Sequence, residues 1–151
     1  MTRQTPNARR AARGFTLIEI LSVLGIASVL SSIAWPSFQS SLHKARRADA
    51  LVAVAQVQIA QERSYANRRR YAGLAELRTA DRSSAGHYLL EMQSADERGY
   101  ELMARATGSQ AGDVRCRVLK LSVIDGTPTL RSGEDDRVAN DAAANRRCWG
   151  L

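Results

Sequence analysis

The stretch RGFTLIEILSVLGIASVLSSIAWPSF, residues 13–38, decides how the chain folds. Residues 15–35 form an apolar run of 21 residues in which Glu19 is the only formal charge. As a helix, this run would be about 30 Å long, which is the thickness of the hydrocarbon core of a bilayer. An ionised carboxylate is costly in that environment, so Glu19 needs a partner or a proton. The run therefore predicts a transmembrane helix half with one charge that requires an explanation.

The residues before this run form a short basic leader. Residues 1–14 contain four arginines and no acid. The whole chain has 22 basic and 15 acidic residues. Without the leader, 18 basic and 15 acidic residues remain, which gives a net charge of only +3. A basic flank holds the N-terminus of a membrane helix in the cytoplasm. Because much of the charge belongs to the leader, the high net charge by itself is weak support for a nucleic-acid partner.

The helical pattern continues beyond the apolar run. Apolar side chains recur at steps of three and four residues, as on one face of a helix. The stripe consists of Phe38, Leu42, Ala45, Ala48, Val52, Ala55 and Ile59, and the opposite side carries Lys44, Arg46, Arg47, Gln56, Gln58 and Gln61. We predict one helix from Phe15 to Ser64, about 75 Å long. We expect it to be kinked at Pro36, which lacks a backbone N–H, and to pack its stripe on a sheet.

The rest of the chain predicts an antiparallel sheet. Alternating segments at 87–93, 99–107, 116–124 and 129–131 are separated by turn sequences, which is typical of a meander. A loop with a short helix near 73–79 precedes the strands, and a polar tail, 132–151, follows them. The expected fold class is α+β, a long N-terminal helix on a four-stranded sheet. The segments are a leader (1–14), a membrane and assembly half-helix (15–35), an amphipathic half-helix (36–64) and the loop, sheet and C-terminal region (65–151).

The two cysteines, Cys116 and Cys148, can pair if this part of the chain is exported. A bridge that closes a loop of about 33 residues would stabilise the fold by roughly 3–4 kcal/mol in the chain-entropy model. The alternative is two separate buried thiols in a cytosolic protein.

The segment Gly14-Phe15-Thr16-Leu17-Ile18-Glu19, between a basic leader and an apolar run, resembles the class III signal of type IV pilins and pseudopilins. The resemblance implies cleavage between Gly14 and Phe15 by a membrane aspartyl prepilin peptidase, and N-methylation of Phe15. Pro36 lies where many pilins carry a helix-kinking proline. The long helix, the sheet and the two late cysteines match the pilin fold.

Two local features resemble the minor pilins of the PilE type. One is the tyrosine-rich basic loop SYANRRRYAGLAEL after the helix. The other is the AGD-x-x-C sequence that ends at Cys116, together with the terminal pair Cys148-Trp149.

Glu19 gains a role from this resemblance. Cleavage after Gly14 leaves a free ammonium on Phe15, and Glu19 lies one helical turn later. The resemblance implies that Glu19 of one subunit neutralises the ammonium of a neighbour and sets the stagger between subunits. The alternative is a protonated Glu19 that is satisfied within its own helix.

Two other forms of processing stay open. A conventional signal peptide could be cut after Ser32-Ile33-Ala34, which would release a domain that starts at Trp35. The carboxylate of Glu19 and the length of the apolar run argue against this. The segment could also be a single-pass anchor with an uncleaved leader.

The sequence contains no recognisable catalytic set, so we expect neither an enzyme nor a cofactor. His43 and His87 lack the spacing of metal ligands, and we expect no metal. Glu134-Asp135-Asp136 could hold a cation, but the alternating spacing of a calcium loop is missing, which favours a solvated turn.

Basic residues close to aromatic ones give a possible DNA-binding surface. Arginines that lie beside aromatic rings can bind DNA through phosphates and stacking. The groups are Arg68, Arg69 and Arg70 between Tyr65 and Tyr71, Arg146 and Arg147 before Trp149, and Arg115 and Arg117 around Cys116. A disulfide would bring the last two groups together. The alternative is a solvated basic face or salt bridges to neighbouring subunits.

These features predict a minor type IV pilin, a structural subunit of a pilus involved in assembly, adhesion, twitching motility or DNA uptake. The alternatives are a type II secretion pseudopilin and a DNA receptor for natural transformation. The expected partners are major and minor pilins, the prepilin peptidase, inner-membrane assembly proteins, the membrane before assembly and, as a further possibility, DNA. The expected location is the inner membrane, single-pass with the N-terminus in the cytoplasm, and later the extracellular pilus.

Overall fold

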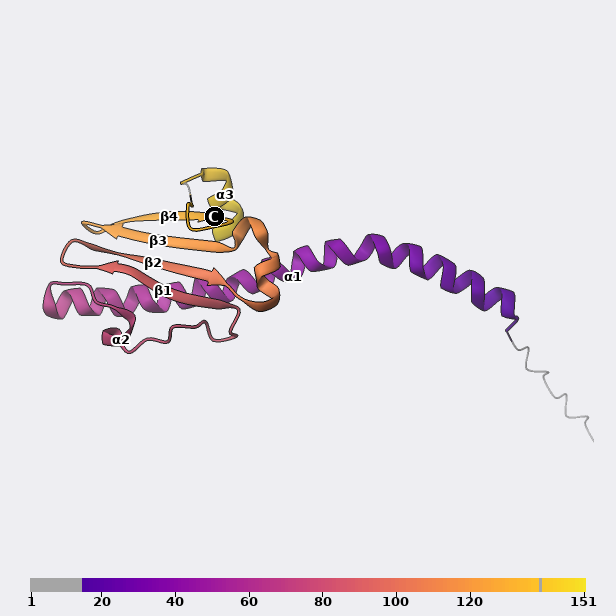
Figure 1. Ribbon diagram of the computed structural model, residues 1–151, viewed down its shortest axis with the longest axis horizontal. Coiled ribbons are helices and arrows are strands. Elements are labelled where there is room, and N and C mark those ends of the chain that lie inside the picture. The colour runs from indigo at the N-terminus through magenta and orange to yellow at the C-terminus, as the bar shows by residue number, and fades with distance from the viewer. Residues whose placement is uncertain (1–14, 139) are drawn as a thin grey trace, which may run out of the picture. The chain divides into compact units, whose positions relative to one another are not determined.

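The computed structural model describes residues 15–138 and 140–151, so the leader and Gly14 lie outside the described residues. The chain divides into two compact units, one that ends at Phe38 and one that comprises Gln39–Leu151. Figure 1 shows the order of the elements from helix α1 to helix α3. The kink at Pro36 stays a prediction, because the segments on its two sides belong largely to different units.

Helix α1, Leu17–Arg68, has 52 residues and contains Pro36. It begins with a capping box, in which the Glu19 N–H donates to Thr16 Oγ1 (3.3 Å) and the Thr16 N–H donates to the Glu19 carboxylate (3.4 Å). It ends four residues beyond the expected Ser64. Tyr65 stacks on Tyr71 with 4.8 Å between ring centroids and holds the last turn in place. Arg69, with φ 58°, then ends the helix in a left-handed conformation.

The part of α1 in the first unit has the surface of a membrane helix. Its large apolar side chains, from Leu17 to Phe38, are between 46% and 80% exposed. The hydroxyls of Ser22, Ser28 and Ser32 donate to backbone carbonyls one turn earlier at 2.7–2.8 Å, so their polar atoms are satisfied within the helix. By length and composition, α1 can cross a membrane.

The four expected strands form one antiparallel sheet in the order β1-β2-β3-β4, which confirms the predicted fold class (Figure 1). The strands are β1 (Tyr88–Ala95), β2 (Gly99–Ala106), β3 (Val118–Ile124) and β4 (Thr127–Gly133). β4 is longer than the expected 129–131, because Asp125 and Gly126 form a two-residue turn with φ of 49° and 77°. That tight turn leaves Thr127 and Pro128 inside the ladder with β3.

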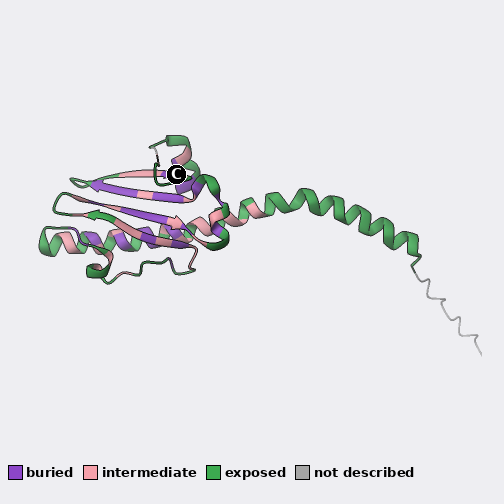
Figure 2. Cartoon of the chain, in the orientation of Figure 1, coloured by how far each residue is buried: buried purple, intermediate pink, exposed green. Residues whose placement is uncertain are grey.

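The face of α1 that packs on the sheet is not the predicted one. Its buried residues are Ala50, Ala53, Val54, Val57 and Gln61, and Figure 2 marks these turns as buried beside the strands. In the predicted stripe, Val52 and Ile59 are 52% and 55% exposed. Both faces of this segment are apolar, so periodicity alone does not select one. The alanines and valines of the packed face let the helix come close to large buried residues such as Leu102 and Leu119.

Two polar residues expected on the solvent side of α1 lie on the buried face because each has a specific partner. Gln61 is fully buried, and its side chain exchanges two hydrogen bonds with the backbone of Ala72, at 2.7 and 2.9 Å. Arg47 pairs with Asp113. Buried polar groups are stable when they are paired in this way.

The C-terminal region contains a helix, α3 (Ala142–Trp149), where a polar tail was expected. The carboxylate of Asp141 caps it by accepting from the Ala143 and Ala144 N–H groups at 2.7 and 2.9 Å. Gly150, with φ 72°, ends it. Three short elements complete the fold: α2 (Leu74–Leu77), η1 (Gly108–Gly112) and η2 (Val114–Cys116).

Candidate nucleic-acid interface

Helix α3 is fixed by a disulfide to η2 and by several hydrogen bonds to β4. Cys148 forms a disulfide with Cys116 of η2. The Asn145 side chain donates to the Leu130 carbonyl (2.7 Å) and accepts from the Ser132 hydroxyl (2.9 Å). The indole N–H of Trp149 donates to the Arg131 carbonyl at 3.1 Å. α3 is therefore a rigid support for the arginines that it carries.

Arg47 connects α1 to the loop before β3 and to α3. Its guanidinium makes two hydrogen bonds to the Asp113 carboxylate, at 2.6 and 2.9 Å, and a third to the Arg147 carbonyl at 2.8 Å. The Arg47 and Asp113 side chains are 12% and 8% exposed, so the pair is shielded from water. This bidentate geometry is the strong form of an arginine–carboxylate pair.

Gln110, fully buried in η1, extends this network. Its amide nitrogen lies 3.1 Å from the Tyr88 hydroxyl and 3.2 Å from both Asp113 Oδ2 and the His43 carbonyl. Burial raises the pKa of Tyr88 to about 12, against the lowering effect of the Gln110 hydrogen bond. Tyr88 is therefore a neutral, fixed partner of the network at physiological pH.

A basic hollow of about 410 Å³ lies where α3 meets α1. It is lined by Ser40, Lys44, Arg47, Arg146, Arg147, Gly150 and Leu151, and no carboxylate side chain is among them. We refer to these residues as the basic hollow. The Arg146 and Arg147 side chains are exposed, and neither they nor Lys44 has an ion-pair partner among the described residues.

Asp141 directly precedes α3. Backbone hydrogen bonds from Ala144 and Ala143, and to a lesser extent the charges of Arg147 and Arg146, lower the pKa of Asp141. Asp141 is engaged in capping the helix. The hollow thus holds a local excess of positive charge.

The second arginine group, Arg68 to Arg70, lies 24 residues along α1 from Lys44, about 36 Å at the helical rise. Arg68 and Arg70 both pair with the single carboxylate of Glu76, the latter at 2.7 Å. Arg69 is exposed. The sequence predicted both groups as DNA-binding candidates, and the structure shows that they do not form one surface.

The aromatic residues beside the arginines belong to the core. Tyr71 is buried between Tyr65 and Tyr100, with ring centroids 4.8 and 5.0 Å away. Trp149 is 8% exposed and its indole N–H is engaged. These rings are not available to stack on bases. The arginines beside them are left with phosphate contacts as their way of binding DNA.

The disulfide places Arg115 close to α3, as expected, since Cys148 Sγ lies 3.5 Å from the Arg115 carbonyl. Arg115 is exposed, whereas the Arg117 guanidinium donates to the Ala111 carbonyl at 3.0 Å.

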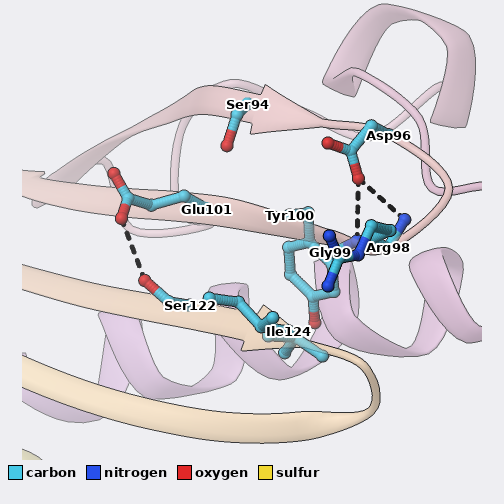
Figure 3. Close-up of a pocket in the computed structure, with 9 residues that line it drawn as sticks. Ser94, Asp96, Arg98, Gly99, Tyr100, Glu101, Ser122 and Ile124 are labelled. Carbon is cyan, nitrogen blue, oxygen red and sulfur yellow. Dashed lines mark hydrogen bonds between the residues drawn. The ribbon is translucent and has the colours of Figure 1, made fainter.

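Another hollow, of about 310 Å³, lies at the opposite end of the sheet, beside the β1–β2 turn (Figure 3). The Asp96 carboxylate accepts from the Arg98 and Gly99 N–H groups. Burial raises the pKa of Glu101, but hydrogen bonds from Lys120 and Ser122 outweigh this and hold it below its ordinary value. These acids are satisfied internally, and a site lined by carboxylates does not suit a polyanion.

The remaining candidates have structural partners. Asp136 pairs with Arg105 at 2.7 Å, and Asp135 accepts from the Arg137 N–H, so the acidic run forms a local turn. His43 contacts Gln110 through Nδ1 (3.2 Å). Within residues 15–138 and 140–151, no group of three His, Cys, Asp or Glu side chains is placed to hold a metal ion.

Among the N-terminal candidates, Phe15 is described and is 79% exposed, whereas Gly14 lies outside the described residues. Glu19 occupies the capping box with Thr16. The spacing Thr16-x-x-Glu19 is a recognisable capping signal that our sequence reasoning missed.

Comparison with known proteins assigns the family. Residues 9–35 match the prokaryotic N-terminal methylation motif. Residues 36–120, more than half of the chain, match the family described as "Type IV minor pilin ComP, DNA uptake sequence receptor". The chain belongs to this family of type IV minor pilins. The predicted pilin identity is thereby confirmed, and the pilin's N-terminal apolar helix is a membrane anchor before assembly.

A curated relative matches only a short part of the pilin. It is the "Prepilin peptidase-dependent protein D" of Escherichia coli (strain K12), 51% identical over 39 residues. The match spans 26% of the pilin and 27% of that relative. Arg146 and Arg147 lie beyond the range matched by the minor-pilin family, so the basic hollow is only partly covered by the comparisons.

Proposed function

We propose that this pilin is a minor subunit of type IV pili that takes part in DNA uptake by binding the DNA backbone at the basic hollow. The observation that supports the proposal is the cluster of Lys44, Arg146 and Arg147, which have no ionic partner among the described residues, on a rigid support. The family description names a DNA uptake sequence receptor. Arginine and lysine side chains bind phosphates, and their contacts weaken as salt rises.

The direct test is a titration of the purified full chain, in non-ionic detergent, with a short DNA duplex at two salt concentrations. Three phosphate contacts predict a slope of roughly −3 for the logarithm of the binding constant against the logarithm of the salt concentration. Absence of binding at low salt would contradict the DNA part of the proposal. The same duplex with a changed sequence measures whether the pilin also reads bases.

The proposal includes processing by a prepilin peptidase between Gly14 and Phe15, followed by N-methylation of Phe15. The methylation-motif match over residues 9–35 supports it. Gly14→Ala should leave the leader attached, so intact mass measurement should find a heavier protein than the processed wild type. A normal processed mass for this variant would refute the cleavage site.

We also propose that the protein spans the inner membrane once, with the N-terminus in the cytoplasm, and then enters the filament through α1. Glu19 would exchange its contact with Thr16 for the Phe15 ammonium of a neighbouring subunit. The apolar stripe, which stays exposed in one subunit, would pack on neighbouring helices. Glu19→Ala should be processed normally but be depleted from sheared pili, whereas unchanged incorporation would overturn the pairing.

A further inference from the structure

The basic hollow lies a short distance along the chain from the membrane segment. Phe38 is the last large exposed side chain of the first unit, and Ser40 and Lys44 of the hollow follow two and six residues later in α1. Six helical residues span about 9 Å, and six residues in any conformation span at most about 20 Å. Ser40 and Lys44 of the hollow therefore lie within about 20 Å of Phe38 along the chain.

The helical distance from Phe38 is comparable to the depth of the headgroup layer plus the length of a lysine or arginine side chain. A bilayer is about 40–45 Å thick with its polar regions and about 30 Å without them. Trp35, whose ring centroid lies 6.4 Å from that of Phe38, is of a residue type that is enriched at such a boundary. Side chains on a helix tilt toward its N-terminus, so the Lys44 side chain leans along α1 toward Ser40.

The charge of the hollow suits an anionic surface. Lys44, Arg146 and Arg147 have no ion-pair partner among the described residues, and the charge of Arg47 is already matched by Asp113. By contrast, the surface beside the β1–β2 turn is lined by Arg70, Asp96, Glu97 and Arg98, two acids against two arginines. Unpaired positive charge is thus present in the part of the domain that follows the membrane segment in the chain.

We propose that the basic hollow binds the phosphate headgroups of anionic phospholipids at the outer surface of the membrane while α1 holds the pilin there. This inference rests on the membrane stage of the proposed function, and it adds a regulation of the same site. A lipid phosphate and a DNA phosphate share one chemistry and compete for the same side chains. The membrane therefore occupies the hollow until the subunit leaves for the filament, and DNA binds afterwards.

The test is native mass spectrometry of the full chain in non-ionic detergent, titrated with phosphatidylglycerol or with phosphatidylcholine. The wild type should retain phosphatidylglycerol in preference. The double variant Arg146→Gln, Arg147→Gln should lose roughly 25-fold in that affinity, at about fivefold for each cation near an anionic surface. The matched control is Arg63→Gln, Arg69→Gln, two exposed arginines at the other end of the domain, which should behave as wild type.

Equal affinity of both double variants for phosphatidylglycerol would overturn the proposal, and so would a wild type without preference between the lipids. In a Trp35→Phe background, retained fluorescence of the buried Trp149 checks that α3 stays folded. Lys44→Gln, outside α3, is a second variant that should also weaken lipid binding. A DNA titration of the same samples separates the two proposals. DNA binding without lipid preference rejects this inference alone, and lipid preference without DNA binding rejects the DNA proposal alone.

Discussion

Two regions of the globular unit carry arginine clusters, and they differ in what neutralises them. At the end of α1, Arg68 and Arg70 share the carboxylate of Glu76. At α3, Arg146 and Arg147 line a hollow without a carboxylate side chain. The longer run of arginines is therefore the less available one, because the capacity to bind an anion depends on the charge left unpaired.

The two regions also differ in how they are held. The α3 region is tied down by the buried Arg47–Asp113 pair, the disulfide and several hydrogen bonds to β4. The ion pairs at the other end involve side chains that are 35–55% exposed, where water screens the charges. The difference predicts large effects of substitutions at one end and small effects at the other.

The largest effect, a loss in the free energy of unfolding, is expected for Asp113→Asn. This change leaves the Arg47 charge buried without its partner, which typically costs about 3–5 kcal/mol. We expect urea unfolding in a Trp35→Phe background, followed by the fluorescence of Trp149, to show this loss. Asp136→Asn, at a surface ion pair, is the control and should change the free energy of unfolding by less than about 1 kcal/mol. Similar losses in both variants would remove the contrast between buried and exposed pairs.

The next largest effect on the free energy of unfolding is expected when Cys116→Ser is combined with Cys148→Ser. Without the disulfide, which joins residues 32 positions apart, the unfolded chain gains entropy, and we expect a loss of roughly 3–4 kcal/mol in the same unfolding experiment. α3 should also loosen, so its amide hydrogens should exchange faster, while those at the end of α1 should not change. Uniform acceleration across the domain would contradict a local role of the disulfide.

A smaller effect is expected on DNA binding. Arg146→Gln with Arg147→Gln should weaken binding of a short duplex about tenfold at low salt and reduce the salt slope by about 2. Arg63→Gln with Arg69→Gln removes the same charge at the other end and should have little effect. If this control weakens binding as much, net charge rather than the basic hollow governs the interaction.

The smallest effect, a modest gain in affinity for DNA, is expected for Glu76→Gln. Removing this carboxylate releases Arg68 and Arg70, while stability should change by less than about 1 kcal/mol because the pairs are exposed. Binding of a DNA duplex at low salt should become roughly two- to threefold tighter and return to the wild-type value as salt rises. Glu97→Gln, which removes a charge without releasing an arginine pair, is the control. Equal gains in both variants would show that Glu76 does not restrain these arginines in particular.

Much of the fold could be predicted because its signals are local. The apolar run, the alternation in the strands and the Asp125-Gly126 turn each depend on residues a few positions apart. Helix α3 had local signals as well, since Asp141 precedes three alanines and Gly150 follows the last turn. Its composition of alanine, asparagine and arginine lacks an apolar stripe, which is why a polar tail was expected there.

The buried face of α1 could not be predicted in this way. The stripe from Leu42 to Ile59 is more apolar than the face that packs on the sheet. The packed face was selected by partners far away in the sequence, with Asp113 lying 66 positions from Arg47. The stripe remains free for the contacts that we propose within a filament.

The sequence by itself determined the N-terminal motif, the membrane-length helix, the antiparallel sheet and the pair of cysteines, because each follows from local spacing and residue type. Only the tertiary structure decided which face of α1 is buried, which aromatic rings belong to the core and which arginines keep an unpaired charge. Those outcomes depend on side chains brought together from distant parts of the chain, where Glu76 neutralises one arginine cluster and no carboxylate side chain reaches the basic hollow.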